Sequence, residues 1–199
     1  MSTPAPRPGP LLPGPIGTDR LVLVPLRAEH ADEMAGVLAD PGLYRFTGGA
    51  PPTPEALRSR YARMAAGSPD PAIAWCNWLI GLRDEGRLTG TVQATVTYPV
   101  VTGRDPVAEI AWVVGAPWQG RGIATEAVRG LAGWLADRSV HRLVAHIHPD
   151  HHASAAVARA LGLAPTPYVQ DGEIRWARRP DGGHHPPGGG ADADHSARS

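Results

Sequence analysis

Trp118-Gln119-Gly120-Arg121-Gly122-Ile123-Ala124-Thr125-Glu126-Ala127 is the stretch of this 199-residue chain that decides its fold. An apolar run typical of a strand, Ile110 to Val114, precedes it, and an amphipathic helix is predicted to follow it. Backbone N–H groups at a helix start have no intrahelical acceptor, and glycines let a diphosphate approach without meeting a Cβ atom. The sequence therefore predicts an anion cradle at the start of this helix.

The length of the chain favours one domain with a single core. A Pro-rich arm over residues 1–16 and a tail of Gly, Pro, His and Asp over residues 178–199 lack the apolar residues that a core needs. We expect both ends to be disordered and residues 17–177 to form the folded domain.

Composition excludes several classes of partner. The 19 basic residues, all arginine, balance 19 acidic ones and are dispersed along the chain, so we expect no nucleic-acid partner. No cationic leader and no membrane-spanning apolar run is present, which predicts a cytoplasmic protein without a membrane partner. The one cysteine, Cys76, lies in an apolar run between Trp75 and Trp78, so we interpret it as a core residue rather than a nucleophile.

The pattern of apolar residues and turn signals predicts strands that alternate with helices. The clearest strand is Leu88 to Tyr98, where apolar or small residues alternate with Thr and Gln. Thr53-Pro54-Glu55 is typical of a helix start. The predicted order is strand 21–24, helices 28–38 and 53–66, strands 74–82, 88–98 and 107–114, the helix after the cradle, strand 143–148, helix 153–161 and a hairpin around Asp171-Gly172.

Two segments resemble the GNAT superfamily of N-acetyltransferases. Gln119, Gly122 and Ala124 match the (Arg/Gln)-x-x-Gly-x-(Gly/Ala) signature for the pyrophosphate of acetyl-CoA, and Pro149 to Leu163 resembles a second family segment. The resemblance implies an α/β (α+β) GNAT fold, with a central mixed, mostly antiparallel sheet of about 6–7 strands flanked by about four helices. Thr18 to Leu23 also resembles the Rim-type branch, whose named members acetylate ribosomal-protein N-termini and many of whose other members take small amines.

The resemblance implies that acetyl-CoA is the cosubstrate, that no metal is required, and which residues bind the cofactor. Backbone groups of Val113 and Val114 would pair with the pantetheine arm, and His151 stands where many members have an Asn that touches it. Ala158 stands where some members have the Tyr that protonates the departing thiolate, so Ser154, at the helix start beside the expected thioester, is the remaining hydroxyl. The cradle would place backbone N–H groups of Gly120, Arg121, Gly122, Ile123, Ala124 and Thr125 on the pyrophosphate, with Gln119 and Arg121 at its edge.

Two residues are candidates for catalysis. Glu109 is a carboxylate on an otherwise apolar strand, which favours a base for the attacking amine, although a salt bridge at the strand end would explain it as well. Ser154 could hydrogen-bond the thioester sulfur or the cofactor arm, or be an ordinary first-turn residue. Family members build the acceptor pocket from the early helices and the strand before the hairpin, which here implies Tyr44, Phe46, Trp75, Asn77 and Trp78.

The acceptor and the oligomeric state stay open. A peptide α-amine has a pKa near 7.7–8.0 and is more often neutral at cellular pH than a lysine side chain, whose pKa is near 10.4. This difference favours protein N-termini over lysine as the acceptor. Protein N-termini and small-molecule amines both remain, as do a monomer and a homodimer.

Three alternative functions compete with this interpretation. His146-Ile147-His148-Pro149-Asp150-His151 resembles the dizinc signature of metallo-β-lactamase-type hydrolases, but few further ligands follow it. A non-catalytic CoA-binding regulator is a second alternative. A Rossmann dinucleotide site fails, because no acidic residue ends a strand about twenty residues after the glycines.

Overall fold

The computed structural model describes residues 11–99 and 105–178. Most of the predicted Pro-rich arm (residues 1–10), the tail from residue 179 onward and the loop residues Gly103 and Arg104 lie outside the described residues.

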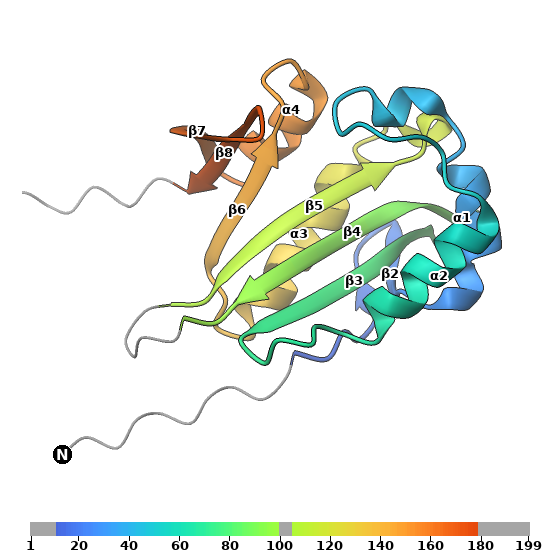
Figure 1. Ribbon diagram of the computed structural model, residues 1–199, viewed down its shortest axis with the longest axis horizontal. Coiled ribbons are helices and arrows are strands. Elements are labelled where there is room, and N and C mark those ends of the chain that lie inside the picture. The colour runs from blue at the N-terminus through green and yellow to red at the C-terminus, as the bar shows by residue number, and fades with distance from the viewer. Residues whose placement is uncertain (1–10, 100–104, 179–199) are drawn as a thin grey trace, which may run out of the picture.

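One mixed sheet runs through the molecule, with its eight strands in the order β1-β2-β3-β4-β5-β6-β8-β7 (Figure 1). Only β5 and β6 are parallel neighbours; every other pair is antiparallel, which confirms the predicted fold class. The strand beyond the predicted six to seven is β1, which consists of two residues that pair with β2 across a turn. The strands are β1 (Ile16–Gly17), β2 (Leu21–Pro25), β3 (Ile73–Leu82), β4 (Arg87–Thr97), β5 (Val107–Val114), β6 (Arg142–Ile147), β7 (Leu163–Gln170) and β8 (Glu173–Arg178).

Four α-helices flank the sheet, as predicted: α1 (Ala31–Val37), α2 (Pro54–Ala65), α3 (Ile123–Ala136) and α4 (His152–Ala160). The hydroxyl oxygen of Thr53 accepts a hydrogen bond from the N–H of Ala56, which caps α2 where the sequence predicted a helix start. The predicted helix 28–38 is divided, because Ala28–His30 forms a 3-10 turn before α1. None of the described helices has both the length and the apolarity to cross a bilayer.

Side chains of the central strands alternate between two apolar layers, as the period of two requires. One face packs against α3 and α4 and contains Cys76, Trp78 and Ile110; the other packs Leu79 and Val113 against α1 and α2 (Figure 1). Cys76 is fully buried, and burial raises the pKa of its thiol to about 11. Its side chain therefore contributes to the core and is a poor source of thiolate at neutral pH.

The sheet opens between its two parallel strands. The ladder between β5 and β6 pairs Val107–Glu109 with Arg142–Val144, and the strands diverge beyond these residues (Figure 1). β6 continues along β8, whereas the β6-facing edge of β5 from Ile110 to Val114 has no ladder partner among the described strands. Backbone groups at such an edge are available to a ligand unless a side chain already binds them, as Gln119 binds the carbonyl of Val114.

Candidate active site

A cleft of about 680 Å³ occupies the opening between β5 and β6. It is lined by nearly every residue that the sequence assigned to cofactor binding. These are Val113, Val114, Gln119, Gly120, Gly122, Ile123, Ala124, Thr125, His151 and Ser154. The splayed strands and the starts of α3 and α4 bring them together.

The cradle presents a series of free donors. Gly120 and Gly122 have φ values of 73° and 77°, a left-handed conformation that favours glycine. The backbone N–H groups from Gly120 to Thr125 donate no hydrogen bond to any described residue, and the first bond of the helix runs from Glu126 to the carbonyl of Gly122. Unpaired donors at the positive end of a 14-residue helix suit a diphosphate.

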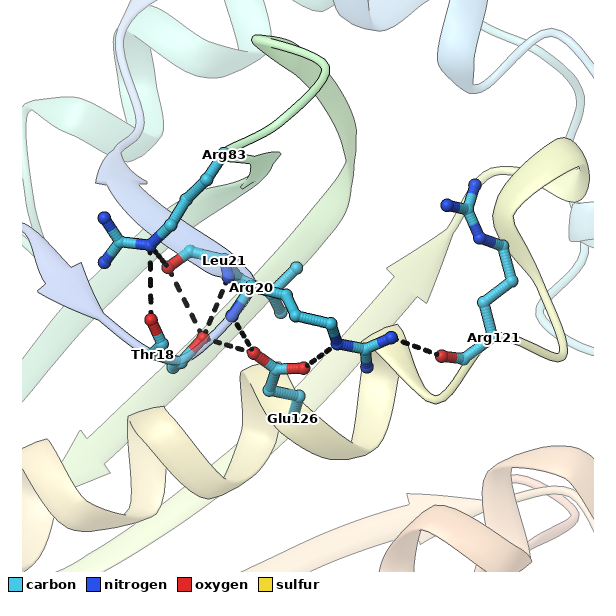
Figure 2. Close-up of polar contacts among 6 residues, drawn as sticks. All are labelled: Thr18, Arg20, Leu21, Arg83, Arg121 and Glu126. Carbon is cyan, nitrogen blue, oxygen red and sulfur yellow. Dashed lines mark hydrogen bonds and ion pairs between the residues drawn. The ribbon is translucent and has the colours of Figure 1, made fainter.

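Arg20 and Glu126 lie beside the cradle (Figure 2), and neither of them lines the cleft. The Glu126 carboxylate accepts hydrogen bonds from the Thr18 hydroxyl at 2.6 Å and from the backbone N–H and Nε of Arg20 at 2.8 and 2.7 Å. Another nitrogen of Arg20, Nη1, donates to the carbonyl of Arg121 at 3.1 Å. Partial burial would raise the pKa of Glu126, but these hydrogen bonds and the Arg20 charge lower it overall.

Two side chains beside the cradle contact other parts of the protein instead of pointing to the free donors. Gln119 donates from Nε2 to the carbonyl of Val114 at 2.9 Å. Arg121 does not line the cleft; its guanidinium pairs with Glu85 at 3.2 Å and points away from Arg20 (Figure 2). The predicted contact of the Arg121 side chain with a pyrophosphate stays a prediction.

Gly90 permits a close approach of β4 to β5 at the cleft. It pairs with Val114, and a Cβ atom at this position would collide with the backbone carbonyl of Val113 and lie 3.0 Å from the Cα of Val114. Backbone cannot move aside as a side-chain tip can. Gly90 therefore permits β4 to lie this close to the two valines that were predicted to pair with pantetheine.

The start of α4 forms the other wall. His151 is the N-cap residue, and its ring accepts a hydrogen bond from the Ser154 N–H at 3.4 Å, while the Ser154 hydroxyl lies 3.2 Å from His151 Nε2. Phe46 stacks on the His151 ring with a centroid distance of 4.5 Å. Burial, followed by the nearby His148, lowers the pKa of His151, so its ring is neutral at neutral pH.

Glu109 and His146 form a pair at the edge of the cleft. Glu109 Oε1 lies 3.2 Å from His146 Nδ1, with the glutamate side chain 55% exposed and the histidine 18% exposed. The strand register places both on one face of the sheet with Ala111. His146 lines the cleft, whereas Glu109 reaches it through this histidine.

A second, smaller cavity of about 350 Å³ lies on the α1 and α2 face of the sheet. Tyr44 and Asn77, which were predicted to border the acceptor pocket, line it. Trp78 borders it, but the fully buried indole packs against Trp134 in the core. Trp75 lines neither cavity and is 37% exposed, and Phe46 belongs to the larger cleft. The two cavities meet at β5, since both are lined by Leu43, Thr47, Ala111, Trp112 and Val113.

The histidine-rich end of β6 does not assemble a metal site in the described part of the chain. No three His, Cys, Asp or Glu side chains within residues 11–99 and 105–178 are grouped so that they could hold a metal ion. Instead, His146 pairs with Glu109, and His148 Nδ1 accepts a hydrogen bond from the N–H of Asp150 at 3.2 Å. Nothing in the described geometry supports the dizinc hydrolase alternative.

Comparison with known proteins assigns the family. The model of the acetyltransferase (GNAT) domain matches residues 20–164, which is most of the chain. The protein belongs to the GNAT acetyltransferase family. Its acetyl donor is therefore acetyl-CoA, and the free donors of the cradle and the glycine backbone around them fit the diphosphate of that donor.

Solved structures of GNAT proteins share this fold. A GNAT-family acetyltransferase from Bacillus anthracis superposes with a TM-score of 0.66 at 18% identity, over 82% of this chain and 97% of that one. AAC(6')-Ib in complex with ribostamycin and coenzyme A gives 0.65 at 18% identity, over 80% and 93%. A Vibrio cholerae protein proposed to be a ribosomal-protein-serine acetyltransferase gives 0.62 at 18%, over 84% and 98%. No curated protein sequence is significantly similar to the chain.

Sequence reasoning did not find several residues of this GNAT site. Arg20 and Glu126 give no sign of pairing, because they are 106 residues apart. Arg60 and Tyr61 line the smaller cavity from α2, where Tyr61 continues the apolar spacing of Leu57 and reads like any core residue. The tertiary structure, in which α2 packs over the sheet, is needed to show that Arg60 and Tyr61 face a cavity.

Proposed function

We propose that this GNAT protein is an N-acetyltransferase that transfers the acetyl group from acetyl-CoA to a primary amine in a ternary complex. The observation that carries the proposal is the meeting of the two cavities at Ala111, Trp112 and Val113. A donor in the larger cleft and an acceptor in the smaller one can then approach each other from opposite sides of β5. Such proximity supplies a large part of the rate of a two-substrate reaction.

The reaction requires a neutral amine. Its nitrogen attacks the thioester carbonyl, a C–N bond forms, the C–S bond breaks, and the ammonium proton has to leave. We assign proton removal to Glu109, acting directly or through His146. With Nδ1–H of His146 donated to Glu109, Nε2 carries the lone pair that accepts a proton. The contact between Glu109 and His146, which could otherwise be an ordinary salt bridge at the strand end, is thus part of the proposed proton transfer.

Ser154 is proposed to assist the leaving thiolate. Its hydroxyl lines the cleft and lies 3.2 Å from Nε2 of His151. A hydroxyl in this position can hydrogen-bond the sulfur as negative charge develops on it. His151, which is neutral and held by Phe46, would orient that hydroxyl.

The acceptor is either a protein N-terminus or a small-molecule amine. The Thr18 to Leu23 resemblance to the Rim-type branch supports the first, and the similarity to the Vibrio cholerae protein concerns the fold only. AAC(6')-Ib was solved in complex with ribostamycin, so small-molecule amines are included among the acceptors to be tested.

The experiment combines a thiol-release assay with mass spectrometry of the product. Acetyl-CoA is offered with N-terminal peptides, amino acids, polyamines and aminoglycosides, and an acetylated amine is the expected product. Glu109→Gln and His146→Gln should each lower kcat by about 10²–10⁴-fold while the affinity for CoA changes little. Part of the loss should return at high pH.

The matched control is Glu29→Gln, which removes another exposed ion-paired carboxylate that lines neither cavity. It should behave as wild type. The proposal fails if no amine is acetylated by a protein that binds CoA. The assignment of Glu109 fails if Glu109→Gln lowers thermal stability but leaves kcat of the folded protein unchanged.

A further inference from the structure

The smaller cavity has an unusual charge for a site that receives amines. Arg60 is the only charged residue that lines it, and no Asp or Glu of the described chain does so. The other polar side chains are neutral, among them Asn77 and Gln93, which are paired across β3 and β4. A polycationic acceptor would therefore meet a positive charge without a carboxylate to balance it.

A buried hydroxyl in this cavity lacks a partner. Tyr61 is 2% exposed, and its hydroxyl makes no hydrogen bond with any described residue. Tyr44, which also lines the cavity, donates its hydroxyl proton to the carbonyl of Leu38. Buried hydroxyls are normally paired, so an acceptor brought against Tyr61 would satisfy a donor that the described residues leave unpaired.

Arg60 precedes Tyr61 on α2 and also lines the cavity, and it has no acidic partner among the described residues. Burial raises the pKa of Tyr61 to about 12, and the Arg60 charge opposes that rise. Two other arginines of α2 are occupied, since Arg58 pairs with Asp32 at 2.7 Å and Arg63 donates to the carbonyl of Ser59. Within residues 11–99 and 105–178, Arg60 forms neither an ion pair nor a hydrogen bond.

We propose that the smaller cavity selects amines that carry a carboxylate, with the Arg60 guanidinium and the Tyr61 hydroxyl binding that carboxylate. The proposal rests on the N-acetyltransferase function proposed above and narrows its acceptor class. A guanidinium donates in pairs to a carboxylate, and the phenol adds one more donor. The carboxylate belongs either to a small amino acid or to an acidic residue near a peptide N-terminus, and polycationic aminoglycosides and polyamines are rejected.

The test uses two pairs of acceptors whose members differ in a single charge, together with one polycation. One arm compares an amino acid with its amide, and the other compares Ser-Asp and Ser-Asn peptides of otherwise equal sequence; ribostamycin is the polycation. Acetylation is measured by thiol release, and binding of each acceptor to the CoA-loaded protein is measured by calorimetry. We expect the acidic member of at least one pair to have a KM about tenfold lower than its neutral partner.

Variants connect the preference to the two residues. Arg60→Gln should remove the preference for the acid, and Tyr61→Phe should raise the acceptor KM about threefold to tenfold, both with an unchanged KM for acetyl-CoA. Arg63→Gln is the control on the same helix and should behave as wild type. A variant that only disturbed the fold would change the KM for acetyl-CoA as well as the KM for the acceptor.

The two proposals fail in different ways. Equal KM and affinity for the acid and neutral members, or preferential use of ribostamycin, would overturn the carboxylate proposal while acetylation itself continued. A preference in binding that depends on Arg60, without acetylation of any amine, would support the pocket assignment and overturn the N-acetyltransferase function. The amino-acid and peptide arms identify which source of carboxylate the cavity accepts.

Discussion

Arg20 and Glu126 are 106 residues apart in the sequence, yet Arg20 Nε donates to Glu126 Oε2 at 2.7 Å and Arg20 Nη1 donates to the cradle carbonyl of Arg121 at 3.1 Å (Figure 2). One guanidinium thus joins the turn after β1 to the first turn of α3. A Cβ atom at Gly122 would lie 3.5 Å from Arg20 Nη2, so the same group also borders the left-handed glycine of the cradle. We infer that this pair holds the cradle in its binding conformation.

Arg20→Gln is expected to weaken CoA binding about threefold to tenfold, as measured by calorimetry. The side chain is 51% exposed, so we expect a moderate effect despite the short distances. Arg20→Lys should restore only part of the affinity, because an ammonium cannot bridge Glu126 and the Arg121 carbonyl as a planar guanidinium does. Arg27→Gln, which removes an exposed ion pair with Glu29, is the control. Unchanged affinity in a folded Arg20→Gln protein would contradict the inference.

The stability contributed by Glu126 should depend on pH. Its folded-state pKa lies below the ordinary value of 4.5, so the carboxylate stabilises the fold above about pH 4.5 and loses this effect as the pH falls through the folded-state pKa. The wild type should therefore have a higher Tm than Glu126→Gln at pH 7, and the difference should shrink below pH 4.5. Thermal unfolding across this range measures it. A difference in Tm that stays constant down to pH 3 would show that the hydrogen bonds do not depend on the charge.

Gly122→Ala should weaken CoA binding about tenfold, the effect of losing one hydrogen bond to a charged group. The reason is the backbone, because a φ of 77° is strained for alanine and its relief would turn the cradle N–H groups. Gly67→Ala is the matched control, since Gly67 has a φ of 83°, has open space around it and does not line either cavity. Both variants should lose stability, but only Gly122→Ala should lose affinity. Equal affinities in the two variants would argue against the cradle.

Gly90→Ala is expected to lower the free energy of unfolding by about 1–3 kcal/mol, the usual cost of overpacking. The added methyl group would meet the backbone of Val113 and Val114, and CoA affinity should fall as these residues shift. Gly133→Ala, in an open and exposed position of α3, should instead stabilise the protein by about 0.5–1 kcal/mol. Chemical denaturation of both variants provides the comparison. A neutral Gly90→Ala would mean that β5 can move away from β4 without cost.

The elements that the sequence predicted best have strong local signals. Strand Val107–Val114 was predicted with its observed bounds, and the capping by Thr53 placed the start of α2 correctly. Helix α4 and strand β6 are each shifted by one residue, because the ends of elements depend on hydrogen bonds that local preference does not fix. Strand β1 was missed, since two residues become a strand only by pairing with β2.

The site shows the same division between local and distant contacts. The cradle was predictable because its glycines, its free N–H groups and the following helix are consecutive in the chain. The Glu109–His146 pair was only partly predictable, because Glu109 was a candidate base and His146 belonged to the histidine run, but their contact depends on the parallel register of β5 and β6. Phe46 was predicted to border the acceptor pocket, and its stacking on His151 in the larger cleft depends on a contact between distant parts of the chain that the sequence does not show.

By itself, the sequence determined the family, the donor cradle and most of the elements, because periodicity, capping and glycine conformation act between neighbouring residues. The tertiary structure alone decided how Arg20 supports the cradle, where β5 and β6 separate, and which side chains of α2 face the smaller cavity. These features depend on contacts between residues far apart in the chain. Such contacts arise only when helices and strands pack over one core, and no local preference encodes the resulting partners.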